Sequence, residues 1–381
     1  MMLPNGWKKV KLGDVAKVTS GGTPSKDNSS YWNGDIPWIS ALEMHNNFVD
    51  SAKLKITKEA LEKGSSLAKK DDLLLLTRGS MLWNRIPVCL CMRDVAFNQD
   101  VKCIHPNDTV NSKFLLYWFG SMENLIMNKV EGTGIGAGKL ATDFILDLNV
   151  MVPPLNEQKK IAETLSVWDK AIEKTEKLIE AKEVQKKALL SKLIESEISE
   201  KIRIGNVVID KRTWKKDKIG NVLKIGHGKD YKNLSVGDVP VFGTGGYMTT
   251  VDKYLYDGET VCIGRKGTID RPFYYSGKIW TVDTLFYTYD FKNVLPKYIY
   301  YVFCSIPWKS LNEASGVPSL TSKIIESIFI SIPSLREQKA IAELLSTADN
   351  ELNLLKQQLE NYKKQKQGLM QKLLTGQWRV K

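Results

Sequence analysis

The sequence predicts an α+β protein in which two loop-rich α+β domains are separated by two long helices that form an antiparallel coiled coil. Three observations predict this fold: an internal repeat, two apolar seams with a mean period of about 3.5 residues, and short strands bounded by turn residues. With 381 residues the chain is long enough for several folding units. The expected segments are a first α+β domain at residues 1–152, a first long helix at 153–203, a second α+β domain at 204–332 and a second long helix at 333–381.

An internal repeat relates the two halves of the chain. The segment Val152–Ser166 returns as Ile332–Ser346, with the pattern Pro-x-Leu-x-Glu-Gln-Lys-x-Ile-Ala in both copies and a constant offset of 180 residues. A second echo relates Trp7-Lys8-Lys9 to Trp214-Lys215-Lys216, and fainter matches pair 78–80 with 265–268 and 131–135 with 313–317. The chain therefore alternates domain, helix, domain, helix.

Each repeated motif opens a long helix, because proline ends the preceding strand and an early glutamate complements the helix dipole. The apolar positions that follow are spaced alternately by four and three residues, which is typical of a coiled coil. They are Ile161, Leu165, Trp168, Ile172, Ile179, Leu189 and Leu193 in the first helix, and Ile341, Leu345, Leu352, Leu355, Leu359, Tyr362, Leu369 and Leu373 in the second. Polar residues at Thr175, Lys182, Lys186 and Lys366 interrupt these seams and are expected to fix their register.

The connectivity predicts the direction of the helices. Because the second α+β domain is inserted between them, the second helix most simply runs back along the first. A helix of about 40 residues is about 60 Å long. The pair is therefore expected to set the separation of the two domains.

The two α+β domains are predicted from short strands and one aromatic helix each. The expected strands are 15–19, 35–39, 73–77, 88–92 and 101–104 in the first domain, and 240–242, 260–263, 280–283 and 286–289 in the second. The expected helices are 113–120 and 296–305. Several loops between these elements combine glycine with basic, amide and aromatic side chains, a composition that suits either a solvated turn or contact with nucleic acid.

Composition and charge restrict the class of protein. The content of 43% hydrophobic and 26% charged residues is that of a globular chain, and no apolar run reaches the length of a membrane span. Five scattered cysteines do not make a disulfide framework, so we expect a reducing compartment, the cytoplasm. The formal net charge of +12 favours a polyanionic partner, although solubility explains a basic surface equally well.

The residues carry a resemblance to a known family. The duplicated Pro-x-Leu-x-Glu-Gln motifs, the opening Trp-Lys with Leu12-Gly13-Asp14-Val15, the run Ser20–Pro24 and the closing segment Gly368–Gly376 resemble the specificity subunit of Type I restriction-modification systems. The resemblance covers the whole chain. It implies two target recognition domains, each reading one half of a split double-stranded DNA site, with the helices setting the gap.

The same resemblance implies partners and cofactors outside this chain. Two methyltransferase subunits and the restriction endonuclease or translocase subunits are the expected partners, and a membrane is not. The chain itself is expected to bind no cofactor, whereas S-adenosylmethionine, ATP and magnesium are expected on the partner subunits. The chain is accordingly expected to be a non-catalytic recognition subunit.

The loops supply the candidate DNA-binding residues. Lysine binds phosphate, arginine bonds bidentately to guanine, and asparagine pairs with adenine. The expected phosphate contacts are Lys26, Arg85, Lys229, Lys232, Lys266 and Arg271, and the expected base contacts are Arg78, Asn84, Tyr231 and Arg265. Two rival functions remain open: a coiled-coil scaffold with basic protein-binding domains, and a self-sufficient nuclease or methyltransferase.

Other motifs carry less weight. The stretch Gly132–Lys139 lacks the glycine and the Ser or Thr that a phosphate-binding loop requires at fixed positions. Cys89 and Cys91, followed by Cys103 and His105, provide four possible zinc ligands, but the usual knuckle spacing is absent and buried thiols are the preferred interpretation. No metal site is therefore expected. With three histidines in the chain, no catalytic constellation is expected either.

Overall fold

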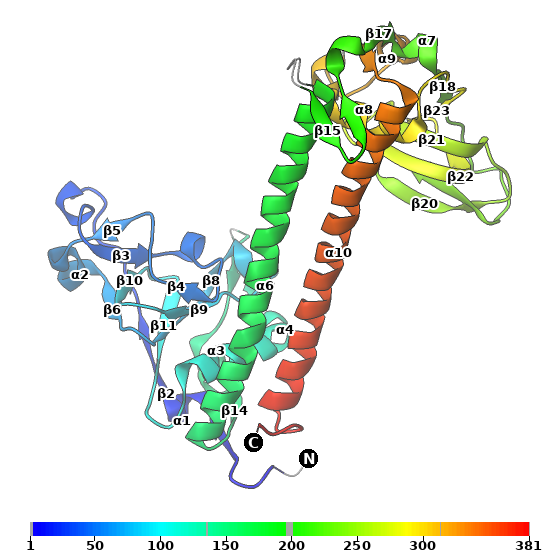
Figure 1. Ribbon diagram of the computed structural model, residues 1–381. Helices are drawn as coiled ribbons and strands as arrows, with labels where there is room; N and C mark the ends of the chain where they lie inside the picture. Colours follow the sequence, from blue (N-terminus) through cyan, green and yellow to red (C-terminus); the bar gives the residue numbers. More distant parts are fainter. Residues whose placement is uncertain (1–2, 135, 196–200, 313, 381) are drawn as a thin grey trace. The chain divides into compact units, whose positions relative to one another are not determined.

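The computed structural model describes residues 3–134, 136–195, 201–312 and 314–380. They form two compact units: unit 1 comprises Met1–Thr175 with Gln358–Lys381, and unit 2 comprises Glu176–Gln357 (Figure 1). Two long helices, α6 (Leu155–Leu190) and α10 (Leu335–Leu374), each begin in one unit and end in the other. Each unit therefore consists of one α+β domain, the start of one long helix and the end of the other.

Unit 1 is built around two sheets. The five-stranded sheet has the order β2-β11-β7-β9-β4, and the four-stranded sheet has the order β5-β3-β10-β6. The strands are β2 (Ala16–Ser20), β3 (Ile36–Ile39), β4 (Phe48–Val49), β5 (Lys55–Ile56), β6 (Ser66–Ala68), β7 (Leu73–Leu76), β9 (Val88–Cys91), β10 (Val95–Phe97) and β11 (Val101–Pro106). The four consecutive leucines of β7 are all buried, as expected for a central strand covered on both faces.

Smaller elements complete unit 1. Strand β1 (Lys8–Lys11) pairs with β14 (Asn149–Val152), which directly precedes α6. Strand β8 (Arg78–Gly79) pairs with β13 (Gly138–Lys139), which also pairs with β12 (Glu131–Gly132). The helices are α1 (Leu12–Val15), α2 (Lys58–Gly64), α3 (Ser112–Ser121), α4 (Glu123–Met127) and α5 (Thr142–Leu146), with 3₁₀ turns at Ser29–Tyr31, Ala41–Glu43 and Ser80–Trp83.

Unit 2 contains one six-stranded sheet of order β18-β23-β21-β22-β19-β20. Its strands are β18 (Lys224–His227), β19 (Val239–Gly243), β20 (Gly246–Val251), β21 (Tyr256–Gly264), β22 (Phe273–Thr281) and β23 (Leu285–Tyr289). Two strand pairs, β15 (Ile202–Ile204) with β16 (Val207–Ile209) and β17 (Lys215–Lys218) with β24 (Phe329–Ile332), stand apart from it. The helices are α7 (Ile219–Val222), α8 (Pro296–Ser305) and α9 (Ser322–Ser327), with 3₁₀ turns at Lys211–Thr213 and Trp308–Leu311.

The first long helix ends earlier than the expected range 153–203. After α6, a π-helical turn covers Ser191–Glu195, and strand β15 then occupies Ile202–Ile204. The alternation of Ile202, Arg203 and Ile204 has the two-residue period of a strand, and Gly205, with a φ of 54°, allows the tight turn into β16. Residues 196–200 of the expected range lie outside the described residues.

Within each unit the two long helices pair antiparallel. In unit 1 the start of α6 contacts the end of α10, with the rings of Trp168 and Tyr362 5.8 Å apart. In unit 2 the end of α6 contacts the start of α10, where Lys182 pairs with Glu351 at 2.7 Å. Every seam residue named from the sequence is buried or half-buried. The seam ends also enter the domain cores: Ile161 and Leu165 are part of the unit 1 core, together with Leu373, while Leu193, Ile341 and Leu345 are part of the unit 2 core.

Candidate nucleic-acid interface

In unit 1, the loops that carry two of the candidate residues, Lys26 and Arg78, attach to one short segment, Phe97–Asp100, which we call anchor 1. The N–H of Gly22, in the loop that carries Lys26, donates to the carbonyl of Phe97 at 2.9 Å. The N–H of Arg78 donates to the carbonyl of Asp100 at 3.2 Å. Anchor 1 therefore holds the Lys26 loop and the Arg78 loop at the same end of the sheets.

Unit 2 repeats this arrangement with different side chains. Its segment Thr281–Thr284, anchor 2, accepts from the N–H of Lys229 at 2.9 Å and from the N–H of Arg265 at 2.7 Å. A tryptophan supports the first loop in each unit: Trp38 Nε1 donates to the carbonyl of Gly22 at 3.0 Å, and Trp280 Nε1 donates to the carbonyl of Lys229 at 2.9 Å. The two units thus present equivalent loop clusters.

A third segment joins each cluster. In unit 1, Arg78 pairs with Lys139 across β8 and β13. In unit 2, Lys266 forms a bridge with Ser319, and the N–H of Gly267 donates to the carbonyl of Pro318 at 2.8 Å. Lys139 and Ser319 were not among the contact residues expected from the sequence, although the faint match of 131–135 with 313–317 lies just before them. Within the stretch Gly132–Lys139, Gly132 of β12 pairs with Gly138 of β13, and the N–H of Thr133 donates to the carbonyl of Ala137 at 2.8 Å.

Glycines allow the close approach of loop and anchor. A Cβ atom on Gly21 would lie 2.3 Å from the carbonyl oxygen of Asn98 in anchor 1, and one on Gly228 would lie 1.9 Å from the carbonyl oxygen of Val282 in anchor 2. No side chain fits at either position. Gly79 and Gly267 have positive φ values of 149° and 88°, where a residue with a Cβ is strained.

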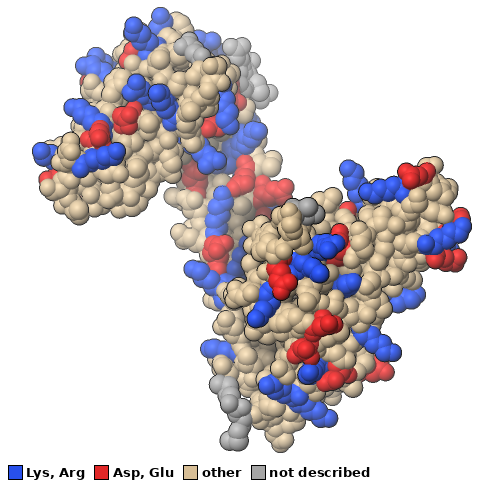
Figure 2. All heavy atoms as spheres, turned by 180° about the vertical axis from the view of Figure 1, so that it is seen from behind, with Lys and Arg blue, Asp and Glu red and all other residues tan. Residues whose placement is uncertain are grey.

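The side chains that the loops present are basic and exposed. Lys26, Arg78, Asn84, Lys229, Lys232, Arg265, Lys266 and Arg271 are all exposed to solvent. Within the described parts of the chain, none of the lysines and arginines among them forms an ion pair. In the face shown in Figure 2, lysine and arginine are spread over both units with acidic residues among them, so the basic charge is not confined to one patch.

Two predicted contact residues have structural roles. The guanidinium of Arg85 donates to the carbonyls of Met44, at 2.9 Å, and His45, at 3.0 Å, so it ties two loops of unit 1 together instead of projecting freely. Tyr231 is half-buried and packs against the small core of Val239, Val241, Val251, Trp280 and Val282. The sequence could not distinguish these two side chains from freely exposed ones.

Each unit also has a groove beside the start of its long helix. The unit 1 groove, about 540 Å³, is lined by Lys159, Ala162, Glu163 and Ser166 of α6 and by residues 106–108 and 110–113. The unit 2 groove, about 400 Å³, is lined by Lys339, Ala342, Glu343 and Ser346 of α10 and by residues 295–297. These helix positions are related by the repeat offset of 180 residues, so the two grooves are equivalent.

Fold and site define a duplicated protein that presents one basic loop cluster in each half. The sequence matches the family described as "Type I restriction modification DNA specificity domain" over residues 4–183 and 211–362. The chain belongs to this family of specificity subunits.

Individual relatives agree with this assignment. The chain is 33% identical to the Type I restriction enzyme EcoR124I/EcoR124II specificity subunit of Escherichia coli over 165 residues, which is 43% of this chain but only 40% of that protein. It is 25% identical to the MjaVIII specificity subunit of Methanocaldococcus jannaschii over 420 residues, covering 100% of this chain and 95% of the relative.

Solved structures share the fold. The S subunit of a Type I restriction-modification system from M. genitalium superposes with a TM-score of 0.64 at 18% identity, covering 98% of both chains. A chain from a study of complex assembly in the Type I restriction-modification system gives 0.60 at 17% identity, covering 99% of this chain and 100% of that one. Among the described residues, no helix has both the length and the apolar character needed to cross a membrane.

Proposed function

We propose that this specificity subunit reads a split sequence in double-stranded DNA, with one half-site for each loop cluster. The observation that carries the proposal is the repeated geometry: the same glycine-dependent anchoring in both units, with different side chains on the loops. Equivalent scaffolds suit the same kind of ligand, whereas different loop residues suit different base sequences. The target is therefore asymmetric.

The loop residues have different proposed tasks. Lys26, Lys229, Lys232, Lys266 and Arg271 contact phosphates, because an exposed lysine or arginine neutralises a phosphate without reading sequence. Arg78, Asn84 and Arg265 contact base edges, since their planar groups form paired hydrogen bonds in the major groove. Lys139 joins the first set because it lies opposite Arg78 in the same ladder. Arg85 and Tyr231 support the loops from behind.

The partner subunits are proposed to dock on the long helices and the adjoining grooves. Two grooves with equivalent linings suit two copies of one partner, which supports the proposal of two methyltransferase subunits for each specificity subunit. S-adenosylmethionine binds to those subunits, and ATP and magnesium bind to the endonuclease or translocase subunits. The specificity subunit supplies position and sequence choice.

Mapping of adenine methylation in cells that carry the methyltransferase partner, with and without this gene, tests the function. A split motif that depends on the gene supports DNA reading. Exchanging residues 21–140 for those of another family member should then change only one half of the motif. If an active partner gives no gene-dependent methylation, a coiled-coil scaffold becomes the better explanation, and methylation by the purified chain alone would favour the self-sufficient enzyme.

A further inference from the structure

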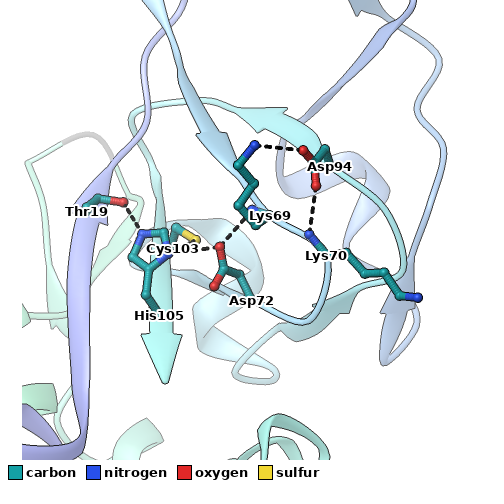
Figure 3. A network of polar contacts seen from close by, with 7 residues as sticks. All are labelled: Thr19, Lys69, Lys70, Asp72, Asp94, Cys103 and His105. Carbon is teal, nitrogen blue, oxygen red and sulfur yellow. Dashed lines mark hydrogen bonds and ion pairs between the residues drawn. The ribbon is translucent and has the colours of Figure 1, made fainter. Parts of the chain in front are cut away.

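Three side chains of metal-binding type meet on one face of the five-stranded sheet of unit 1 (Figure 3). Asp72 immediately precedes β7, and Cys103 and His105 lie two residues apart on β11. Because Cys103 is opposite Leu74 in the ladder, and alternate residues of a strand face the same side, Asp72 and His105 reach the same face as Cys103. Their ligand atoms all lie within 4.8 Å of one another.

The spacing of these atoms is close to that of a zinc site. His105 Nδ1 lies 2.8 Å from Asp72 Oδ2 and 3.8 Å from Cys103 Sγ. Tetrahedral zinc, with bonds of about 2.3 Å to sulfur and about 2.0 Å to nitrogen and oxygen, separates nitrogen from sulfur by about 3.6 Å and nitrogen from oxygen by about 3.3 Å. Adjustments of about half an ångström or less would bring these two separations to the zinc values, and the third, between Cys103 Sγ and the Asp72 carboxylate, is within 4.8 Å.

The surroundings support the same chemistry. The second ring nitrogen of His105, Nε2, lies 2.8 Å from the hydroxyl of Thr19, which fixes the ring as an outer hydrogen-bond partner does in zinc proteins. The backbone N–H of Lys69 donates to Asp72 Oδ2 at 2.7 Å. The ammonium group of Lys69 pairs with Asp94 at 3.0 Å (Figure 3). Its positive charge is therefore bound to Asp94 and not to the carboxylate of Asp72.

We propose that Asp72, Cys103 and His105 bind one zinc ion, with a solvent molecule in the fourth position. Thiol, imidazole and carboxylate together suit zinc better than magnesium or calcium, which prefer oxygen ligands alone. As the zinc–sulfur bond forms, the Cys103 thiol releases its proton to solvent. His105 binds through Nδ1 and keeps its proton on Nε2, which donates a hydrogen bond to the hydroxyl oxygen of Thr19. No oxidation or reduction is involved.

Unit 2 has no equivalent of this site among its described residues. Tyr287 on β23 occupies the position that Cys103 occupies on β11: Tyr287 lies opposite Gly226 of β18, as Cys103 lies opposite Thr19 of β2. The ring of Tyr287 packs against those of Tyr256 and Tyr289, with a centroid separation of 5.9 Å in each case. Aromatic packing thus takes the place of the polar cluster. The expected stoichiometry is one zinc ion per chain, bound in unit 1, and it does not depend on the proposed DNA-reading function.

A bound zinc ion would join the start of β7 to β11, close to the Lys26 loop and the Arg78 loop. Cys103 lies three residues beyond anchor 1, and Thr19 lies three residues before Gly22 on the strand that leads into the Lys26 loop. Metal ligation would therefore stabilise the sheet that supports this loop. Cys89 and Cys91, the other thiols considered from the sequence, lie outside the three-residue group.

The test uses the full chain, stripped with a chelator and then dialysed against zinc. Elemental analysis should find one zinc per chain, and cobalt substitution should give a thiolate-to-metal charge-transfer band. Cys103→Ser should abolish that band, and His105→Gln should weaken zinc binding at least tenfold. The matched control is Cys262→Ser, which removes a buried thiol from the unit 2 sheet and should leave both readouts unchanged.

Wild-type chain that retains much less than one zinc after dialysis would overturn the proposal, and this result does not depend on the folding of any variant. Stoichiometric binding that survives unchanged in both Cys103→Ser and His105→Gln would also overturn it, because the metal would then lie elsewhere. The supporting result is one zinc per chain in the wild type and in Cys262→Ser, with loss of zinc binding in Cys103→Ser and His105→Gln. Both of these variants must keep the native circular dichroism spectrum.

Discussion

Lys366 on α10 donates to the carboxylate of Asp169 on α6, and the pair is mostly buried, with side-chain exposures of 14% and 20%. Asp169 also accepts from the hydroxyl of Tyr117 at 2.6 Å. Unit 2 contains the same relationship: Lys186 pairs with Asp349, which accepts from the hydroxyl of Tyr301. The lysine of each pair comes from the end of one long helix and the aspartate from near the start of the other. These polar seam positions therefore specify the antiparallel register within each unit.

Lys366→Met should destabilise unit 1 by about 2 kcal/mol, because it leaves the mostly buried Asp169 carboxylate without its cation. The matched control is Lys364→Met, which changes an exposed lysine of α10 in the same unit and should cost under about 1 kcal/mol. Hydrogen exchange of α6 amides between residues 161 and 175 is the readout. Equal effects of the two substitutions would show that the buried pair does not determine the register.

Gly228→Ala should destabilise the Lys229 loop by about 2 kcal/mol or more, because the added methyl group would overlap the carbonyl of Val282. DNA affinity should fall with it. Gly245→Ala is the control, since a Cβ atom there meets nothing within 4 Å. Thermal unfolding and exchange of β18 amides measure the effect, and an undisturbed β18 in Gly228→Ala would contradict the close approach.

Lys229→Ala and Arg265→Ala should weaken DNA binding in different ways. Loss of a phosphate contact at Lys229 lowers affinity on all sequences and reduces the slope of log K against log salt by about 1. Loss of a base contact at Arg265 costs about 1–3 kcal/mol of discrimination at one position of one half-site. Binding titrations at several salt concentrations, on cognate and single-mismatch duplexes, separate the two.

Arg85→Met is the contrasting variant for the same titrations. Because the guanidinium of Arg85 is engaged with the carbonyls of Met44 and His45, its loss should lower the stability of unit 1 and leave the salt slope unchanged. A slope reduced as far as in Lys229→Ala would return Arg85 to the phosphate contacts named from the sequence.

Insertion of one heptad into each long helix should lengthen the gap between the half-sites. Seven residues add about 10.5 Å to a helix, which corresponds to about 3 base pairs of DNA. Insertions after Thr175 and after Gln357 fall where the chain passes between the two units. Methylation mapping gives the gap directly. An unchanged gap would show that the helices do not set it.

Cys304 should react slowly with alkylating reagents in the native chain. Burial raises the pKa of this thiol to about 11, so the thiolate fraction at pH 8 falls about a hundredfold below that of a free cysteine. Peptide mapping after timed exposure to iodoacetamide measures the rate. Denatured chain is the control and should react at the ordinary rate; equal rates in both states would contradict the burial of the thiol.

The sequence predicted the strands and helices best where local pattern and tertiary environment agree. The expected strands 73–77 and 286–289 match β7 and β23 to within one residue at each end, and the expected helix 296–305 matches α8. Strands β1 and β17 were not predicted, because Lys8–Lys11 and Lys215–Lys218 lack apolar alternation. They are strands because each pairs with the strand that precedes a long helix.

The repeated Glu-Gln pair shows what a one-dimensional pattern leaves out. From the sequence, the glutamate only complements a helix dipole. In the structure, Glu157 accepts from Trp7 Nε1, whereas the fully buried Gln158 accepts from the N–H of Asn111 and donates to the carbonyls of Thr109 and Pro153. Glu337 and Gln338 make the equivalent bonds in unit 2. These partners lie between 5 and 150 residues away, a relation that helix periodicity does not encode.

The division of the long helices between the units has a consequence for synthesis on the ribosome. Unit 2 is continuous in the chain, but the unit 1 core includes Leu373 and Leu374, and Glu157 pairs with Arg379 at 2.6 Å. Unit 1 therefore stays incomplete until residues 358–380 have left the exit tunnel, after unit 2 has already been translated. A premature stop codon just before Gln358 would accordingly leave unit 2 whole and damage the unit that is made first.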